Sequence, residues 1–264
     1  WKDFLNTHSF PQKAVECSGK VRDKIKIMDH QEPKFNLPAS KLPPHKHGDK
    51  KDFRESFHWR VFRILSEFVE GFQFIFDFKK TVTFFGSARL KPSDKWYQEA
   101  EKLGGLLAKS GFTVITGGGP GIMEAGNKGA SENGGESVGL NIMLAKEQRI
   151  NPYVTKSEAF HYFFTRKVML SYAAWAYVFF PGGFGTLDEF FELVTLVQTK
   201  KVDAKIPIVI VGKEYWNGIL SWMDEVVYKK FDAIDKEEME IYKLVDSAEE
   251  AFEIIKDSKE RREF

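Results

Sequence analysis

Residues 173–186, Ala-Ala-Trp-Ala-Tyr-Val-Phe-Phe-Pro-Gly-Gly-Phe-Gly-Thr, take the chain from an apolar run into a glycine-rich turn. Because Ala174–Phe180 is apolar on both faces, it is typical of a strand covered on both sides, as in a parallel sheet. Pro181 and the glycines end that strand, and Thr186–Thr199 has the pattern of a following helix. This segment predicts one strand–turn–helix unit of an α/β protein.

The same alternation of short apolar runs and helical patterns continues on either side of that segment. Strands are expected at Thr81–Phe85, Phe112–Thr116, Ser137–Ile142, Ala174–Phe180 and Ile206–Val211. Helices are expected at Asp94–Ser110, Ile122–Asn133, Ser157–Ser171, Thr186–Thr199, Tyr215–Lys230 and Ala248–Lys259. Right-handed crossovers between such strands predict a doubly wound, Rossmann-like parallel sheet with helices on both faces.

The part of the chain before this domain reads differently. Residues 1–51 are rich in Lys, Pro and His and are predicted to form an extended arm or linker. Residues 52–78 place Phe and aliphatic residues at three- and four-residue steps, which predicts an amphipathic helix. We expect that helix to pack on the core or at a subunit interface, and residues 79–264 to form the Rossmann-like domain.

Composition narrows the classes of function. Lys and Arg total 39 and Asp and Glu total 38 in 264 residues, which leaves a net charge of +1. That balance argues against a nucleic-acid partner or a role at a membrane surface. A single cysteine, Cys17, excludes a disulfide within the chain, and no metal-ligand spacing is visible. With no apolar run of ~18 residues and no visible signal peptide, the expected location is the cytoplasm.

Three glycine-rich turns follow predicted strands, at Gly86-Ser87, Gly117–Gly121 and Pro181–Gly185. Carboxyl ends of parallel strands share one sheet edge, where such folds bind their ligands. Glycines leave the backbone open to a ligand, and the helix starting at Thr186 offers free N–H groups to an anion such as phosphate. The pattern is neither a Walker turn nor a dinucleotide fingerprint at the first strand.

Charged side chains stand near these turns, each with two interpretations. Arg166-Lys167 lies between Phe163-Phe164 and Val168-Met169. Arginine suits bidentate binding of phosphate. The alternative is that both residues lie at the surface, with the aliphatic parts of their side chains buried and their charges in solvent. Glu189 follows Thr186 by three residues, so it also fits a capping box with Thr186 as N-cap. A carboxylate in the first turn is next to the anion site either way.

Together these residues resemble the Lonely Guy (LOG) family of phosphoribohydrolases, whose members have often been labelled lysine decarboxylases. Pro181–Glu189 matches the family signature P-G-G-x-G-T-x-x-E at every fixed position. Arg166-Lys167 is similar to its Arg-Lys pair, and Gly117–Gly121 followed by Ile-Met-Glu-Ala is similar to its first nucleotide turn. The resemblance covers roughly residues 80–257.

The resemblance implies cleavage of the N-glycosidic bond of a nucleoside 5′-monophosphate, either AMP or a cytokinin riboside monophosphate, to free base and ribose 5-phosphate. It implies a homodimer, with no cofactor and no metal. Arg166 and Glu189 would be catalytic, and Gly182–Thr186 would hold the phosphate. Residues expected to contact the substrate are Gly86, Ser87, Gly117, Gly118, Gly119, Gly121, Met123, Glu124, Lys167, Gly182, Gly183, Phe184, Gly185, Thr186 and Asp188.

Two other functions compete with this hypothesis. A pyridoxal-phosphate decarboxylase needs a Schiff-base lysine and an acidic partner for the pyridine nitrogen, and nothing marks such a lysine. A non-catalytic nucleotide or cofactor carrier would use the same scaffold, because fold alone does not define function. The pair Arg166 and Glu189 favours the hydrolase, since cleavage passes through an oxocarbenium-like sugar that a carboxylate stabilises. Whether Arg166 anchors the phosphate or assists the departing base stays open.

Overall fold

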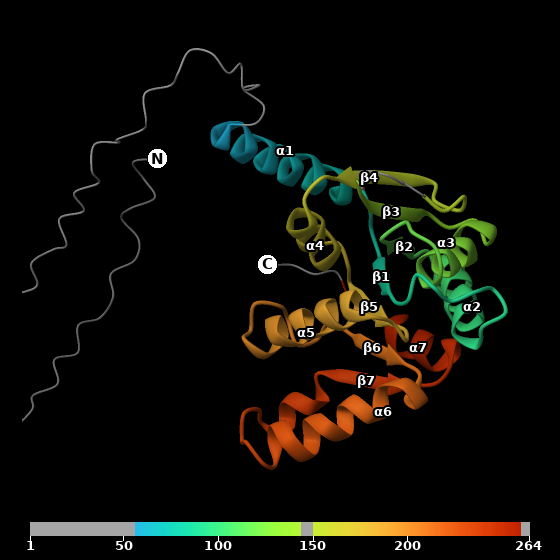
Figure 1. The fold of residues 1–264 in the computed structure, drawn as a ribbon. Coiled ribbons are helices and arrows are strands. Elements are labelled where there is room, and N and C mark those ends of the chain that lie inside the picture. Colours follow the sequence, from blue (N-terminus) through green and yellow to red (C-terminus); the bar gives the residue numbers. More distant parts are fainter. Residues whose placement is uncertain (1–55, 144–149, 260–264) are drawn as a thin grey trace, which may run out of the picture. The chain divides into compact units, whose positions relative to one another are not determined.

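The computed structural model describes residues 56–143 and 150–259. Within them, one parallel sheet has the strand order β4-β3-β2-β1-β5-β6-β7 (Figure 1). Its strands are β1 (Thr81–Phe85), β2 (Thr113–Thr116), β3 (Ser137–Ile142), β4 (Lys156–Phe160), β5 (Ala176–Phe179), β6 (Ile208–Val211) and β7 (Tyr242–Val245). The predicted arm, residues 1–51, and its Cys17 lie outside the described residues.

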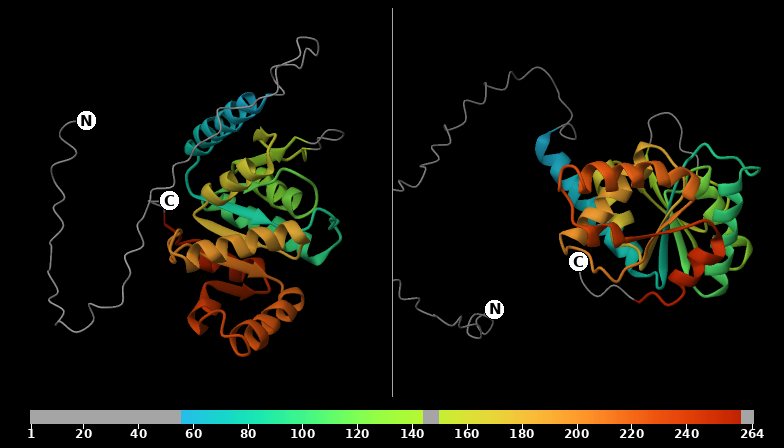
Figure 2. Two further views of the ribbon diagram at one scale, coloured as in Figure 1. Left: turned by 60° about the vertical axis from the view of Figure 1, so that its left-hand side comes forward. Right: turned by 90° about the horizontal axis from the view of Figure 1, so that it is seen from below.

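Helices cover both faces of the sheet (Figure 2). One face carries α2 (Lys95–Lys109), α3 (Ile122–Glu132) and α7 (Ala248–Ile255). The other carries α1 (Phe57–Phe76), α4 (Phe163–Tyr172), α5 (Phe184–Gln198) and α6 (Lys213–Trp222), which a π-helical segment, Met223–Tyr228, extends. The predicted fold class, a doubly wound Rossmann-like parallel sheet, is confirmed.

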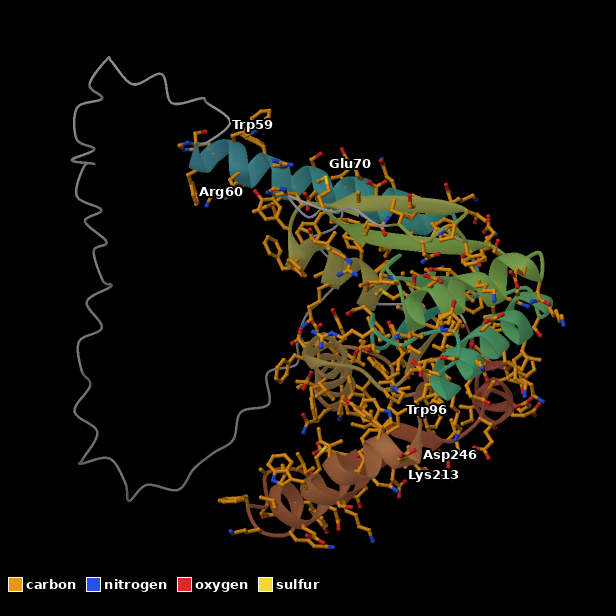
Figure 3. The ribbon with its side chains drawn as sticks, turned by 45° about the vertical axis from the view of Figure 1, so that its right-hand side comes forward. Trp59, Arg60, Glu70, Trp96, Lys213 and Asp246 are labelled. Atoms are coloured by element: carbon orange, nitrogen blue, oxygen red, sulfur yellow. The ribbon has the colours of Figure 1, made fainter. Side chains whose placement is uncertain are left out.

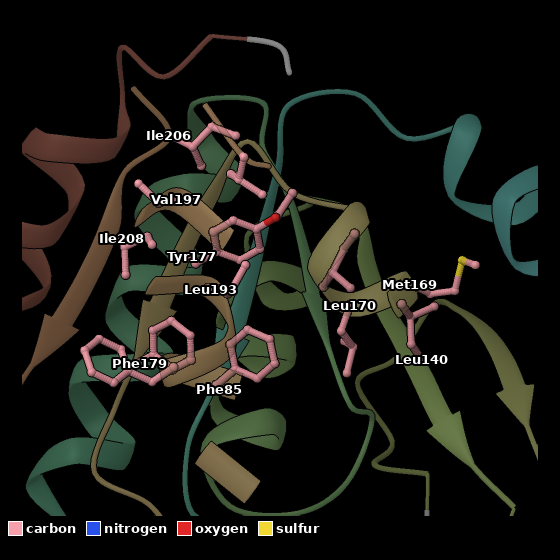
Figure 4. Packing of buried hydrophobic residues seen from close by; sticks show 14 of the residues in the cluster. Phe85, Leu140, Met169, Leu170, Tyr177, Phe179, Leu193, Val197, Ile206 and Ile208 are labelled. Atoms are coloured by element: carbon pink, nitrogen blue, oxygen red, sulfur yellow. The ribbon is translucent and has the colours of Figure 1, made fainter. Parts of the chain in front are cut away.

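Alternate residues of one strand supply the two hydrophobic cores. In β5, Tyr177 and Phe179 belong to the cluster under α4 and α5, and Ala176 and Val178 belong to the cluster under α2 and α7. Figure 4 shows Tyr177 and Phe179 in the first cluster. Each buried large apolar side chain stabilises the fold by about 1.5–3 kcal/mol. The apolar character of residues 174–180 therefore reflects burial on both sides of the sheet.

The chain order across the sheet reverses between β1 and β5. Strands β1 to β4 are laid down in one direction, and the chain then returns through α4 to place β5 beside β1, with Phe85 paired to Phe179. At such a reversal the two following turns diverge to opposite faces and leave a crevice at the carboxyl ends of the strands. The turns after β1 and β5 border that crevice.

The predicted helix Ser157–Ser171 is wrong in its first part. Residues Lys156–Phe160 form β4, an edge strand with exposed polar residues, and α4 begins only at Phe163. Pairing with β3 decides this, because the polar start of β4 has no apolar alternation of its own. The other edge strand, β7, is only four residues long and was not expected; it pairs with β6. The predicted helices Tyr215–Lys230 and Ala248–Lys259 overshoot α6 and α7.

Helix α1 touches the domain through a narrow stripe. Its buried residues are Glu67, Gly71 and Ile75, spaced four apart, and they face α4 and β4. Large apolar side chains on its other faces stay exposed, including Phe62 (64%), Leu65 (57%) and Val69 (51%). One face of this helix is therefore covered by the domain and another is left apolar and open.

Candidate functional site

A cleft of about 950 Å³ opens where the strand order reverses. The turns after β1 and β5, the start of α3, and the first turns of α4 and α5 border it. Thirteen of the predicted site residues line this cleft: Gly86, Ser87, Gly117, Met123, Arg166, Lys167, Gly182, Gly183, Phe184, Gly185, Thr186, Asp188 and Glu189. Residues from four separate segments of the chain therefore meet in one place, at the edge that the strand pattern predicts.

The turn after β5 leads directly into α5. That helix begins at Phe184 with Gly183 as its N-cap, and no side chain caps it. The predicted capping box, with Thr186 as N-cap, is therefore wrong. Because Gly183 takes the extended cap conformation, Thr186 becomes the third helical residue, and its hydroxyl packs where a Cβ on Gly182 would lie 2.1 Å away. The N–H groups at this helix start remain available to an anion in the cleft.

Ser87 ties the three turns together through its backbone. Its N–H donates to the Pro181 carbonyl at 3.0 Å, and its own carbonyl accepts from Ile122 N–H at 3.0 Å. Gly121 has a φ of +72°, and a Cβ there would lie 2.2 Å from the Ser87 carbonyl oxygen. A glycine is therefore required at 121 for the second turn to approach the first.

Four predicted contact residues do not line the cleft: Gly118, Gly119, Gly121 and Glu124. The carbonyls of Gly118 and Gly119 accept hydrogen bonds from Asn151, at 2.9 and 3.0 Å. Glu124 accepts one from the hydroxyl of Tyr97 at 3.1 Å, and burial together with this carboxylate raises the pKa of Tyr97. The second turn therefore contributes Gly117 and Met123 to the cleft, while its remaining residues hold the fold.

Helix α4 brings the Arg-Lys pair to the cleft wall. Arg166 donates through Nε to the Leu140 carbonyl at 2.7 Å, and a Cβ on Gly117 would lie 2.2 Å from its Nη2. Burial lowers the pKa of Arg166, and the negative charge of Glu189 opposes that change. The guanidinium is therefore held from behind by β3 and pressed against a glycine that has no side chain to displace it.

Lys167 points to the acidic side of α5. Its Nζ lies 2.7 Å from Asp188 Oδ2 and 3.1 Å from Glu192 Oε2. Burial alone lowers the pKa of Lys167, but the hydrogen bonds to these two carboxylates outweigh it and the net change is upward. Lys167 therefore stays positively charged beside the start of α5.

Glu189 lies one turn into α5, half-buried in the cleft lining. Its Oε2 is buried, and no hydrogen-bond partner for it exists among the described residues. Burial raises the pKa of Glu189 from 4.5 to about 8; Lys167 opposes the rise and Glu192 adds to it. A carboxyl group that titrates near neutral pH in a cleft is typical of a functional group.

The cleft also contains residues that the sequence patterns did not single out as contacts. Arg89 follows the β1 turn and adds a cationic side chain to the lining. Phe163 and Phe164 are 66% and 48% exposed, and they form an aromatic rim with the predicted contact residue Phe184, which is 92% exposed. The signal for the rim was present as the Phe pair beside Arg166, but sequence alone does not tell whether such aromatics face a core or a cleft.

Within residues 56–143 and 150–259, no group of three or more His, Cys, Asp or Glu side chains is placed to hold a metal ion. No helix of that part of the chain is long and apolar enough to cross a bilayer. The groups that line the cleft include backbone N–H groups, the cations Arg89, Arg166 and Lys167, the carboxyl groups of Asp188 and Glu189, and aromatic rings. Together with the parallel sheet, they define a Rossmann-like α/β protein with a cleft suited to an anionic ligand.

The chain belongs to the LOG family: the family model described as "Possible lysine decarboxylase" matches residues 123–255. A cytokinin riboside 5′-monophosphate phosphoribohydrolase of Rhodococcoides fascians is 28% identical over 155 residues, which are 58% of this chain and 78% of that protein. One from Arabidopsis thaliana is 28% identical over 182 residues, 68% of this chain and 81% of the relative. An uncharacterized protein of Archaeoglobus fulgidus is 32% identical over 120 residues, 45% and 77% of the two chains.

Solved structures with a similar fold include two proteins that handle molybdenum cofactor. The molybdenum cofactor carrier protein of Chlamydomonas reinhardtii is 21% identical, covering 67% of this chain and 97% of its own, with a TM-score of 0.49. The molybdenum cofactor binding protein of Rippkaea orientalis is 20% identical, covering 67% and 93%, with a TM-score of 0.48. Neither likeness bears on what this chain binds.

Proposed function

We propose that this protein hydrolyses the N-glycosidic bond of a nucleoside 5′-monophosphate to a free base and ribose 5-phosphate. The observation that carries the proposal is the buried, unpartnered Oε2 of Glu189 in the same cleft as Arg166 and the uncapped start of α5. The curated relatives named phosphoribohydrolases support it. A carrier needs the anion site but has no use for a carboxyl group with a pKa near neutrality.

The 5′-phosphate binds at the start of α5 in this proposal. The N–H groups of residues 184–186 and the positive end of the helix dipole face it. Lys167 supplies a positive charge at the same helix end, where Asp188 and Glu192 now hold it. A bound phosphate competes with Asp188 for that ammonium group. The ribose then lies one helical turn farther on, beside Glu189.

The reaction breaks the bond between C1′ and the base nitrogen, and the bonding electron pair leaves with the base. Water adds its oxygen to C1′, and the proton that it loses to Glu189 passes on to the base nitrogen, so that the base leaves neutral. Ionised Glu189 stabilises the positive charge that develops on the sugar and accepts the proton from water. Arg166 is fixed by the Leu140 carbonyl and faces the reacting bond as a hydrogen-bond donor.

The base is proposed to lie against the aromatic rim of Phe163, Phe164 and Phe184. Offset stacking on exposed rings suits adenine and its N6-substituted derivatives alike. AMP is therefore the first substrate to test, and a cytokinin riboside monophosphate is the second.

The test is to incubate the protein with a panel of nucleoside monophosphates and to measure the free base that is released by chromatography. We expect release from wild-type protein and loss of release in Glu189→Ala and Arg166→Ala, with the fold of both variants intact by circular dichroism. The control variant is Glu70→Gln, because Glu70 is exposed on α1 and bonds only Ser66 among its described neighbours. Binding of a monophosphate without release from any of them would overturn the hydrolase and favour the carrier.

We also propose that two copies associate through the open face of α1. Phe62, Leu65, Val69 and Phe76 are exposed on this face, and together they form a continuous apolar strip and not isolated apolar side chains. A second copy of the same helix offers the same residues in return, as a two-fold interface requires.

A further inference from the structure

Glu67 is a buried carboxylate on the otherwise exposed helix α1. Its exposed fraction is 7%, whereas the neighbouring Leu65 and Val69 are 57% and 51% exposed. Burying a charged group is costly unless the protein supplies hydrogen bonds to it. A charged side chain among the buried residues of α1 is therefore expected to have specific hydrogen-bond partners.

Among the described residues, the hydrogen-bond partners of Glu67 come from the start of α4, more than ninety residues away. Its Oε1 accepts from His161 N–H at 2.9 Å, and its Oε2 accepts from Tyr162 N–H at 3.2 Å. The hydroxyl of Thr165, which is fully buried, lies 2.6 Å from Oε2 and donates to it. Three donors on one carboxylate make these charge-assisted bonds strong.

Helix α4 has no such carboxylate of its own. Its N-cap, Tyr162, offers no capping side chain, and its first turn contains no acidic residue. In a capping box, a Glu at the third helical position reaches back to the N–H of the N-cap. Here the third position is Thr165, whose side chain is too short, and Glu67 takes that N–H from the neighbouring helix. Its charge also complements the positive end of the α4 dipole.

The two helices approach closely one turn beyond this contact. A Cβ on Gly71 would lie 2.9 Å from the side chain of Met169, which is fully buried under α1. The stripe Glu67, Gly71 and Ile75 therefore presses α1 onto α4 along about two turns. Glu67 is its polar end and defines where α4 starts.

Thr165 is followed in the chain by Arg166 and Lys167, the cations of the cleft. We propose that Glu67 is a positioning residue: by fixing the first turn of α4 it sets where these two side chains enter the cleft. The inference rests on the proposed function for its activity readout, because it assigns Arg166 and Lys167 work on a substrate. It connects α1, which contributes nothing to the cleft lining, to the chemistry of the cleft.

The test removes the charge of Glu67 while keeping its shape. In Glu67→Gln we expect kcat for AMP hydrolysis to fall by about 10- to 100-fold, because small misplacements of catalytic groups have effects of that size. Glu70→Gln, one turn away on the exposed side of α1 (Figure 3), is the matched control and retains wild-type kcat. Amide hydrogen exchange is measured in parallel, and we expect faster exchange over residues 161–167 in Glu67→Gln alone.

A purely structural role would lower the melting temperature and leave kcat per folded molecule unchanged, and that result would overturn the proposal. Unchanged exchange at 161–167 would overturn it independently of any activity. If wild-type protein releases no base, the proposed function fails, and the exchange data still decide whether Glu67 fixes α4. If Glu67→Gln does not fold, Thr165→Val and Thr165→Ser replace it: loss of kcat with Val and rescue with Ser support positioning, and equal kcat in both refutes it.

Discussion

Replacing Glu189 by Gln separates the catalytic role of this carboxyl group from its effect on stability. The change keeps the shape of the side chain and removes its ability to ionise. We expect kcat for release of adenine from AMP to fall by about 10²- to 10⁴-fold, the usual contribution of a positioned acid or base. The same change should make the protein more stable at neutral and higher pH.

The magnitude of the stability effect follows from the raised pKa. The carboxyl of Glu189 titrates near 4.5 in the unfolded chain and near about 8 in the folded protein. At pH 7 folding must therefore bind a proton to it, at a cost of about 1.4 kcal/mol for each pH unit above 4.5, or about 3 kcal/mol in total. Partial exposure of the group reduces that figure, and a buried amide without partners costs about 1 kcal/mol in the variant. The net gain expected at pH 7 is about 1 kcal/mol, or about 2–4 °C in melting temperature.

The sign of this effect depends on pH. A carboxyl group whose folded pKa is raised destabilises the protein progressively as pH rises from 4.5 to about 8 and by a constant amount above. Glu189→Gln should therefore be no more stable than wild type at pH 5 and clearly more stable at pH 8.5. In the wild-type enzyme, kcat/KM should rise with pH up to about 8, because ionised Glu189 is the active form.

The assay combines scanning calorimetry at pH 5, 7 and 8.5 with chromatographic detection of adenine. Glu70→Gln is the control, because it removes an exposed carboxylate that bonds only Ser66 among its described neighbours, and it should change stability by less than about 0.5 kcal/mol at each of these pH values. The reasoning is refuted if Glu189→Gln is less stable than wild type at pH 8.5, or if it keeps more than about a tenth of the wild-type kcat.

Three further substitutions test other parts of the structure. In Gly117→Ala the new Cβ would lie 2.2 Å from Arg166 Nη2 and displace the guanidinium, so kcat should fall by about 10- to 100-fold in the same assay. In Tyr215→Phe the hydrogen bond of 2.8 Å to the Gly182 carbonyl is lost. The turn after β5, where the phosphate is proposed to bind, is then held less firmly, so KM for AMP should rise about fivefold, which is equivalent to about 1 kcal/mol. In Phe62→Glu a charge replaces an exposed apolar side chain on α1, and light scattering should report a monomer where wild type is a dimer.

Each of these has its own control or contrary result. Gly218→Ala is matched to the glycine change, since a Cβ there meets nothing within 4 Å; it should leave kcat unaltered and stabilise α6 by about 1 kcal/mol. Wild-type activity in Gly117→Ala would mean that Arg166 is not held where the substrate reacts. An unchanged KM in Tyr215→Phe would place the phosphate elsewhere. A monomeric wild-type protein would remove the α1 interface.

The arrangement of the cleft was largely predictable from the chain. Three strand-ending turns in the order Gly86-Ser87, Gly117–Gly121 and Pro181–Gly185 were sufficient, because parallel strands bring their carboxyl ends to one edge. Strand β5 was equally predictable from the sequence, since burial on both faces of the sheet requires an apolar residue at every position. These features depend on local composition and on rules that hold for every sheet of this class.

Where the sequence patterns went wrong, partners distant in the chain contact the segment. Thr186–Glu189 has the spacing of a capping box, yet the helix starts earlier, with Gly183 as N-cap, in a turn whose Pro181 and Gly182 carbonyls accept hydrogen bonds from Ser87 and Tyr215. Residues 157–160 continue smoothly into a helical pattern, yet pairing with β3 makes them a strand. The spacing of residues in a segment is compatible with several local structures, and tertiary contacts determine which of them forms.

The sequence by itself determined the class of fold, the edge of the sheet where the cleft lies, and the residue types gathered there, since glycine turns and strand periodicity are local properties. Only the tertiary structure decided which of those residues face the cleft, that Oε2 of Glu189 is buried without a hydrogen-bond partner among the described residues, and that Glu67 of α1 bonds the start of α4. The physical reason is that burial and pKa depend on neighbours up to a hundred positions away in the chain. No periodicity along the chain encodes them.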